Sequence, residues 1–256
     1  MANNLTLIKK YIALLDEVYK SATLTADLES DSSTVRQGSN ARTILIPKMS
    51  MDGLGDYSRK DGYVSGDVDL EWVEKTFNYD RGRRFSVDAM DNEETAALSF
   101  GKLASEFIRT KVVPEMDAWR FASYAKAAGT NKSEDLADGA GVCAAITAAN
   151  IAMDEAEVPQ ESRILYITPT MYEAIQALDT YKSKAMLAGF AKTIRVPQTR
   201  FYSAIDLLSG VDKTSSSGAD ESAGGYKAAS AGKKLNFLIV QKNSPIQFTK
   251  HTVNKV

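Results

Sequence analysis

The spacing of apolar residues changes along the 256-residue chain and divides it into segments of different type. Near the N-terminus, apolar side chains recur every three or four residues, which predicts an amphipathic helix. They are Leu5, Ile8, Ile12, Leu15 and Tyr19. Residues 21–40 are rich in Ser, Thr, Asp and Gly, so we expect an extended arm without a core of its own. A short helix on such a tether should dock elsewhere, either on its own core or on a neighbouring subunit.

Residues 42–79 have the pattern of a two-stranded ribbon. The run 42–51, RTILIPKMSM, has strand composition and leads into a tip rich in Gly and Asp. Residues 67–72 then alternate between acidic and apolar, and residues 76–79 continue strand-like, so the chain should return antiparallel. Ten residues of strand reach about 33 Å. An isolated ribbon of that length is marginally stable in water, so we expect it to lie on a partner.

A long amphipathic helix is predicted after the ribbon. The acids between Asp91 and Glu94 suit a first helical turn, and the apolar residues beyond them share one face. These are Phe100, Leu103, Phe107 and Ile108. Continued through Pro114 to Ala128, the helix would be about 50 Å long. Pro114 should kink it or mark a join between two helices.

The second half of the chain shows the order helix, strand, helix. We expect a helix over 142–157, a strand over 164–167, and a helix that Thr168 and Pro169 begin and that ends near Leu178. This order indicates a mixed α/β domain. Residues 209–234 combine several glycines with many Ser and Ala, which predicts a long mobile loop. Residues 235–241 and 246–251 have the pattern of two closing strands around a turn.

Composition narrows the function. Hydrophobic residues make up 44% of the chain, which is enough for a proper core. Lys and Arg number 31 against 33 Asp and Glu, so no global basic field exists for tight non-specific DNA binding. The single cysteine, Cys143, excludes an intrachain disulfide and fits a reducing, cytoplasmic setting. Charged residues interrupt the N-terminal apolar pattern and no run reaches about 20 apolar residues, so we expect neither a signal peptide nor a membrane span.

Residues that could carry catalysis are few. His251 is the only histidine, and a catalytic triad or a histidine metal site would rest on it alone, near the C-terminus. Cys143 should pack inside its helix. Gly53–Gly55 is too short for a phosphate loop, and the acids at the ribbon tip do not match a calcium loop. We therefore predict no catalytic residue, no cofactor and no metal.

Charged residues around position 80 are better candidates for assembly. Three guanidinium groups lie close together in the sequence, at Arg81, Arg83 and Arg84, and each must pair with an acid or stay solvated. The cluster is therefore either a solvated strand face or an intersubunit salt-bridge site. We favour the second. The acids from Asp88 onward could form a carboxylate cluster, but acids there also complement a helix dipole. The predicted intersubunit interface comprises Arg81, Arg83, Arg84, Asp88, Asp91, Glu93, Glu94, Trp72, Tyr57 and Tyr63.

The order of these elements resembles the Hong Kong 97-type major capsid proteins of tailed bacteriophages. The junction of extended loop and spine helix in coat proteins of some phages of Gram-positive bacteria is similar to DRGRRFSVDAMDNEET (80–95) followed by EFIRTKVVPEMDAWRFASYA (106–125). The axial domain of that family resembles VPQESRILYITPTMYEAIQ (158–176), with its valine-proline turn, hydrophobic strand and proline-capped helix. The likeness covers nearly the whole chain from Arg42 onward.

The resemblance implies an α+β chain with the Hong Kong 97-type capsid fold. Its parts would be an N-terminal arm (1–40), an extended β-hairpin loop (41–91), a long spine helix with the peripheral domain (92–133), an α/β axial domain (134–234) and shared closing strands (235–256). The implied function is a non-enzymatic phage major capsid protein. It would self-assemble as pentamers and hexamers into the icosahedral head shell around the DNA genome, with each extended loop across an adjacent subunit. The implied location is the virion, assembled in the host cytoplasm.

The implied partners are other copies of the chain, portal and decoration proteins, and packaged DNA bound without sequence specificity, with no membrane. A separate scaffolding protein is expected, because only some forty residues precede Arg42. In some family members a loop lysine is crosslinked to an asparagine of a neighbour; Lys48 or Lys60 could be compared with it, but nothing identifies the asparagine, so no crosslink is predicted. Two alternatives remain: an encapsulin-type nanocompartment shell and a cytoplasmic α/β enzyme.

Overall fold

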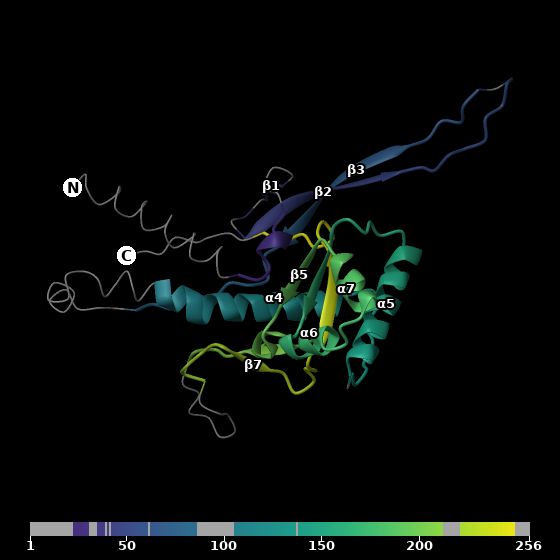
Figure 1. Cartoon of the computed structure of the whole chain (residues 1–256). Helices are drawn as coiled ribbons and strands as arrows, with labels where there is room; N and C mark the ends of the chain where they lie inside the picture. Colours follow the sequence, from purple (N-terminus) through teal and green to yellow (C-terminus); the bar gives the residue numbers. More distant parts are fainter. Residues whose placement is uncertain are drawn as a thin grey trace, which may run out of the picture. The chain divides into compact units, whose positions relative to one another are not determined.

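The computed structural model describes residues 23–30, 35–38, 40, 42–60, 62–85, 105–136, 138–211 and 221–248 (Figure 1). Helices and strands both contribute, so the molecule is a mixed α+β protein. The chain divides into two compact units. One, called the arm unit here, is Ser30–Ser86; the other, the core unit, combines Met1–Glu29 with Val87–Val256.

The arm unit is a three-stranded antiparallel sheet. Its strands are β1 (Arg36–Gln37), β2 (Thr43–Met51) and β3 (Val68–Thr76), in the order β1-β2-β3. β2 and β3 pair along their full length, from Thr43 opposite Thr76 to Met51 opposite Val68. This confirms the predicted antiparallel ribbon. The second strand ends at Thr76 and not at Tyr79, although the Phe77 amide still donates to the Arg42 carbonyl at 2.9 Å.

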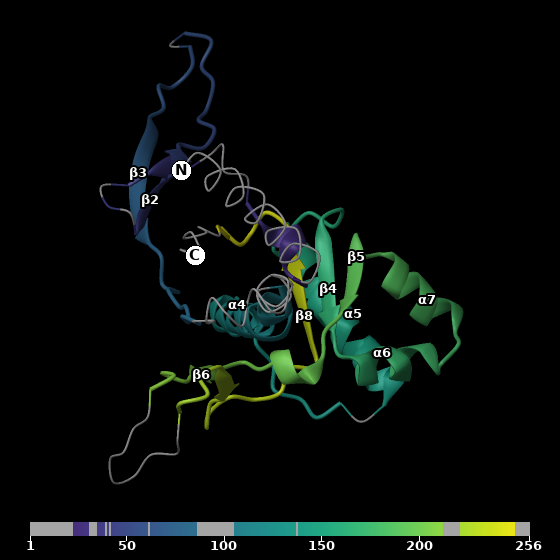
Figure 2. The same cartoon turned by 90° about the vertical axis from the view of Figure 1, so that its left-hand side faces the viewer.

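The core unit is built on a second three-stranded sheet with β4 at its centre. β4 (Arg163–Ile167) pairs parallel with β5 (Lys192–Arg195) and antiparallel with β8 (Phe237–Gln241). Every residue of β4 is buried, because helices cover both faces of the sheet. Figure 2 shows α4 on one side of β4 and β8, and α5, α6 and α7 on the other.

The face that carries Leu165 and Ile167 packs against three helices. They are α5 (Gly139–Glu155), α6 (Pro169–Gln176) and α7 (Tyr181–Ala188). α5 begins three residues earlier than predicted, because the Asp138 carboxylate caps it by accepting from the Gly141 amide at 2.8 Å. Thr168 stands at the predicted N-cap of α6, but its side chain makes no capping hydrogen bond.

The opposite face, with Ile164 and Tyr166, packs against α4 (Val113–Ala127). Phe121 of α4 lies at the centre of this cluster, with ring centroids 5.1 Å from both Tyr166 and Phe201 in edge-on contacts. Leu28 completes the cluster from the short 3-10 helix η1 (Ala26–Leu28). Residues 23–29 of the predicted extended arm therefore pack into the core of the rest of the core unit, a role that the sequence pattern did not indicate.

The long helix passes through Pro114. Residues 105–107 are α-helical, Ile108–Val112 form a π-helical turn (η3), and α4 follows with Pro114 in its first turn. A proline has no N–H and its ring clashes with the carbonyl four residues earlier, and a π turn just before it removes that conflict. This agrees with the predicted join at Pro114. The predicted helix residues Phe100 and Leu103, and the N-terminal helix around Leu5 to Tyr19, lie outside the described residues.

Two predictions for the C-terminal third need correction. Residues 209–234 are not one long loop: β7 (Tyr226–Ala228) pairs antiparallel with β6 (Ile205–Leu207), so the chain folds back as a hairpin. The Tyr226 hydroxyl donates to the Thr199 carbonyl of the 3-10 helix η4 (Gln198–Arg200), which fixes that return. Of the two closing strands, only β8 exists among the described residues.

Residues 246–248 have no strand pairing, and the buried side chain of Gln247 donates to the Thr25 carbonyl. His251 falls outside the described residues. Within the described part of the chain, none of the helices combines the length and the apolar character that crossing a membrane requires.

Candidate functional site

The arm ribbon has one apolar and one polar face along its outer half. Because side chains alternate across a strand, cross-strand pairs also alternate between the faces. Three consecutive pairs on one face are entirely apolar: Pro47 with Trp72, Met49 with Leu70, and Met51 with Val68. We call these six residues the apolar face of the arm. The pairs between them, on the other face, are Lys48 with Glu71 and Ser50 with Asp69.

The hydrogen-bond phase of the ribbon explains how Pro47 fits into β2. The Phe77 amide donates to the Arg42 carbonyl, and the Asp52 amide donates to the Asp67 carbonyl. These bonds place even-numbered β2 residues in the hydrogen-bonded pairs and odd-numbered ones in the non-hydrogen-bonded pairs. Pro47 therefore needs no N–H on the β3 side. The same phase brings the apolar side chains close, since non-hydrogen-bonded pairs have the shorter Cα separation.

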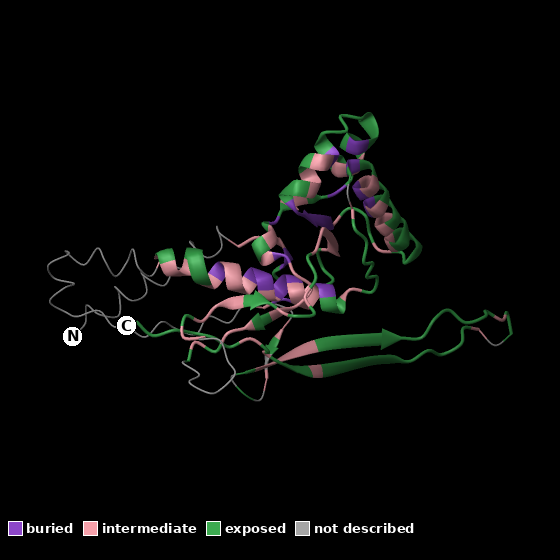
Figure 3. Cartoon of the chain, turned by 90° about the horizontal axis from the view of Figure 1, so that it is seen from below, coloured by how far each residue is buried: buried purple, intermediate pink, exposed green. Residues whose placement is uncertain are grey.

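The apolar face is open to solvent in the isolated chain. Met49 is 60% exposed, Met51 67%, Val68 66% and Leu70 55%. Figure 3 shows the outer half of β2 and β3 as exposed, while the inner half of β2 is intermediate. Exposed apolar residues are ordinary when scattered, but a contiguous apolar patch marks an interaction surface. The six residues form such a patch, because they are neighbours in the ladder.

Trp72 ends the apolar face at the inner side, and Arg36 lies over it. Arg36 of β1 pairs with Leu45, so its side chain lies on the same face of the sheet as Trp72. Its guanidinium carbon is 4.4 Å from the centroid of the Trp72 ring. This cation–π contact leaves Trp72 only 36% exposed and fixes its orientation.

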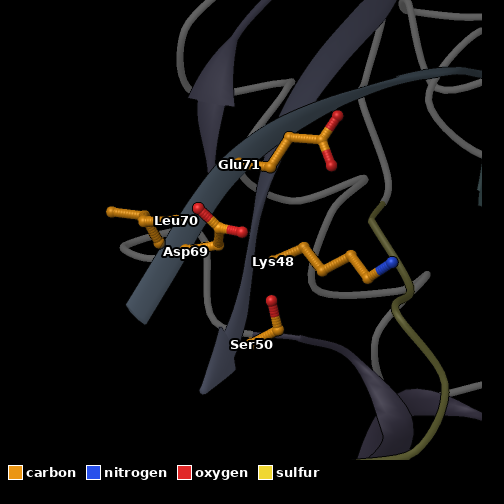
Figure 4. A pocket seen from close by; sticks show the side chains of 5 residues that line it. All are labelled: Lys48, Ser50, Asp69, Leu70 and Glu71. Carbon is orange, nitrogen blue, oxygen red and sulfur yellow. The ribbon is translucent and has the colours of Figure 1, made fainter. Parts of the chain in front are cut away.

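An open hollow of about 340 Å³ lies along the ribbon, lined mainly by residues of its polar face. Its lining residues are Lys48, Ser50, Asp69, Leu70 and Glu71. Figure 4 shows the Lys48 and Glu71 side chains extending to the same side of the ribbon, as their cross-strand pairing requires. The lining is mostly charged and the hollow is open, whereas small-molecule sites are concave and mainly apolar. This face is a solvated one.

The tip of the arm is a tight turn with two tyrosines whose rings contact each other at a tilt. Ser58 and Gly62 bridge each other, and Gly62 has a φ of 81°, a conformation that favours glycine. The turn brings the rings of Tyr57 and Tyr63 to a centroid distance of 4.9 Å. Both remain largely exposed, as does Leu54. The predicted interface residues Tyr57 and Tyr63 thus lie together at the tip, and Trp72 lies further along the ribbon.

The three predicted arginines follow β3 on the exposed segment 81–85. Arg81 and Arg83 each have an interaction partner in the structure. The acids expected to meet these arginines are Asp88, Asp91, Glu93 and Glu94. All four lie outside the described residues, so the salt-bridge site remains a prediction.

Five residues of the apolar face, all except Trp72, were missed by the sequence reasoning. The signal was present, since Leu70 and Val68 alternate with acids and Met49 and Met51 alternate with Lys48 and Ser50. The sequence alone does not show the pairing register of β2 with β3. The observed register, with Met49 opposite Leu70, shows that the two alternations place their apolar residues on the same face.

Burial shifts the ionisation of a cysteine and a tyrosine among the described residues of the core unit. No group of His, Cys, Asp and Glu side chains suited to a metal is present among the described residues. Cys143 packs against the cluster of Val142 and Ile146, and burial raises the pKa of its thiol, which disfavours the reactive thiolate. Burial likewise raises the pKa of the Tyr166 hydroxyl.

Comparison with protein-family models finds none that matches this chain, and comparison with curated proteins finds none with significant sequence similarity.

Proposed function

We propose that this chain is a structural subunit that self-assembles into a closed shell, the major capsid protein of a tailed-phage head with the Hong Kong 97-type fold. The observation that carries the proposal is the exposed apolar face of the arm, Pro47, Met49, Met51, Val68, Leu70 and Trp72. The likeness of residues 80–95, 106–125 and 158–176 to such coat proteins supplies the family. We assign no catalytic role.

Burial of the apolar face supplies a driving force for association. Fully burying one exposed Leu, Met or Val side chain contributes roughly 1.5–3 kcal/mol. The four side chains at the outer pairs are somewhat more than half exposed, so covering them contributes about half of that each. Much of this is offset by the entropy cost of association. One arm contact is therefore weak, and many simultaneous contacts in a closed assembly are needed for stability.

A second copy of the chain is the partner that fits best. A protruding arm that docks on a different surface of the next copy makes a heterologous contact, and such contacts close into rings or shells when the rotation permits. The outer part of the ribbon, where β1 does not pair, also gains from the contact, because two strands alone are marginally stable. In the proposed shell, pentamers and hexamers form with a separate scaffolding protein and with portal and decoration proteins. They enclose DNA without sequence-specific binding, after assembly in the host cytoplasm.

The test compares one lysine on each face of the ribbon. Leu70→Lys places a charge in the apolar face opposite Met49, and the control Ser50→Lys places the same charge on the polar face opposite Asp69. We expect Ser50→Lys to assemble and Leu70→Lys to stay unassembled, with both variants melting close to wild type because Leu70 is 55% exposed. Negative-stain microscopy and sedimentation of the expressed protein, with its scaffolding protein, measure this. Closed particles from Leu70→Lys would contradict the proposal.

The contents of the particles test the capsid assignment separately. A phage head should package DNA when co-expressed with its portal and packaging proteins. A nanocompartment should instead contain a co-purifying enzyme. A protein that stays monomeric in every condition would favour the enzyme alternative.

A further inference from the structure

A short N-terminal segment is held on α4 by polar contacts. The segment Thr23–Glu29, called the strap here, crosses the face of the core unit that carries Phe121. Thr25 is fully buried and Leu28 nearly so, although most residues around them are polar. Leu28 inserts into the cluster of Tyr166, Val196 and Phe201, and Asp27 forms an ion pair with Lys192 at 2.5 Å.

Asp117 of α4 binds the strap through three donors. Its carboxylate accepts from the Thr23 hydroxyl at 2.7 Å, the Leu24 amide at 3.1 Å and the Thr25 hydroxyl at 3.1 Å. Arg200 approaches the second carboxylate oxygen at 3.4 Å. Asp117 is completely buried, so without the strap it would lose three of these partners in a site that water reaches poorly.

The C-terminal segment, residues 246–248, also contacts Thr25 of the strap. The side-chain amide of Gln247 donates to the Thr25 carbonyl at 3.2 Å, and its oxygen accepts from the Tyr124 hydroxyl of α4. Arg120 of α4 donates to the Thr25 hydroxyl at 2.7 Å. Thr25 thus contacts α4 through its side chain and the C-terminal segment through its backbone. Gln247 is itself 92% buried, since its exposed fraction is 8%.

We propose that the strap and the segment around Gln247 form a clasp on α4, in which each is needed to hold the other. If the strap leaves, the buried Gln247 side-chain amide loses the Thr25 carbonyl as its acceptor; if Gln247 leaves, that carbonyl keeps the Leu28 amide as a donor but loses its bond to the C-terminal segment. An unsatisfied buried polar group costs more than its hydrogen bond contributes, so the two dockings are coupled. The coupling must be reciprocal, because it is a free energy shared by both contacts.

The clasp has a defined place along the chain. The strap ends at Glu29, and the arm unit begins at Ser30. The clasp therefore fixes the point at which the chain leaves the core unit for the arm, and its release would free that root together with residues 246–248. This device is independent of the proposed capsid function, and its test needs no assembly.

Hydrogen exchange of the purified chain tests the coupling in one direction. Gln247→Ala should raise amide exchange at Leu24, Leu28 and Glu29 by about five- to thirtyfold, the effect of one buried hydrogen bond. The control is Gln241→Ala, which removes the bonds of that side chain to the Ser162 hydroxyl and from the Asn243 amide but touches no strap residue. It should leave strap exchange unchanged. Equal strap exchange in the two variants would overturn the proposal.

The reverse direction uses the strap. Thr25→Val keeps the shape but removes the hydroxyl that binds Asp117 and Arg120. We expect faster exchange of the Gln247 side-chain amide protons, observed by NMR, and the proposal fails if their exchange equals that of wild type. If Gln247→Ala does not fold, Tyr124→Phe serves instead, since it keeps the ring and removes only the hydroxyl that holds Gln247. It should likewise raise strap exchange, and unchanged exchange would overturn the clasp.

Discussion

Two tyrosines of the core unit differ in what their hydroxyl groups contact. Tyr166 is fully buried, and its hydroxyl has no hydrogen-bond partner among the described residues. The Tyr226 hydroxyl donates to the Thr199 carbonyl at 3.0 Å. Leaving a buried hydroxyl unpaired costs about 1–3 kcal/mol, whereas a typical hydrogen bond contributes about 0.5–1.5 kcal/mol. The same Tyr-to-Phe change should therefore act in opposite directions at the two positions.

We predict that Tyr166→Phe stabilises the protein by about 1 kcal/mol and that Tyr226→Phe destabilises it by about 0.5–1 kcal/mol. The free energy of unfolding in urea, monitored by circular dichroism, measures both. A loss of stability in Tyr166→Phe would show that its hydroxyl has a partner.

Asp154 links stability to pH through Arg163. Its carboxylate accepts from the Gln160 amide at 2.9 Å and from Arg163 at 2.7 Å, and these two hydrogen bonds lower its pKa below the usual value of 3.8. A lowered pKa in the folded state means that the ionised form stabilises the fold above about pH 4. This contribution is lost as the pH falls through the lower, folded-state pKa.

We predict that Asp154→Asn is less stable than wild type at neutral pH, and that the difference shrinks as the pH falls below the usual Asp value. Thermal melting of both proteins from pH 7 to pH 3 measures this. A difference that is constant over the whole range would assign the loss to something other than the charge of Asp154.

At the scale of elements, the close contact between α5 and α6 depends on one glycine. A Cβ at Gly139 would lie 2.1 Å from the Ala174 carbonyl oxygen, which is backbone and cannot move aside cheaply. We predict that Gly139→Ala costs about 1–3 kcal/mol, even though alanine is the better helix former. Gly129→Ala is the control, because a Cβ there meets nothing within 4 Å. The free energy of chemical unfolding of both variants measures this. Equal stability of the two variants would mean that α5 and α6 can move apart without cost.

Elements with a strong local pattern were predictable from the sequence. The ribbon, β4 and the start of α6 have local signals: alternation, a short apolar run, and Thr168 followed by Pro169. β7 was not predictable, because three residues in a Gly-, Ser- and Ala-rich segment become a strand only through pairing with β6. The strap was missed for a similar reason. Its polar residues look solvated in the sequence, and only the buried Asp117 explains why Thr25 is inside.

Some residues of the candidate site could be predicted from the sequence and others could not. Trp72, Tyr57 and Tyr63 could be selected from the sequence as exposed aromatic residues of an arm, and the structure leaves all three accessible. The remainder of the apolar face needed the pairing of Met49 with Leu70, which is a tertiary fact. A shift of one residue in that pairing would have moved Met49 and Met51 to the polar side.

At the scale of the whole molecule, the proposed function would assign folding and assembly largely to different units. The hydrophobic clusters of buried residues belong to the core unit, while the outer half of the ribbon in the arm unit contributes exposed surface. Substitutions on that part of the arm should therefore affect association far more than melting. Arg83, on the exposed segment after β3, allows a test of this separation by charge.

We predict that Arg83→Glu impairs shell assembly while the melting temperature of the unassembled chain changes little. An exposed ion pair contributes about 0–1 kcal/mol, but an arginine fork buried against a carboxylate between subunits is worth more. Lys227→Glu, with the same change in net charge on exposed β7, is the control and should assemble normally. Light scattering and microscopy across a salt series measure assembly, which should weaken with salt where such pairs stay accessible. If Arg83→Glu destabilises the free chain as much as the shell, Arg83 belongs to an ion-pair network within one chain. If the variant assembles normally, Arg83 lies on a solvated face.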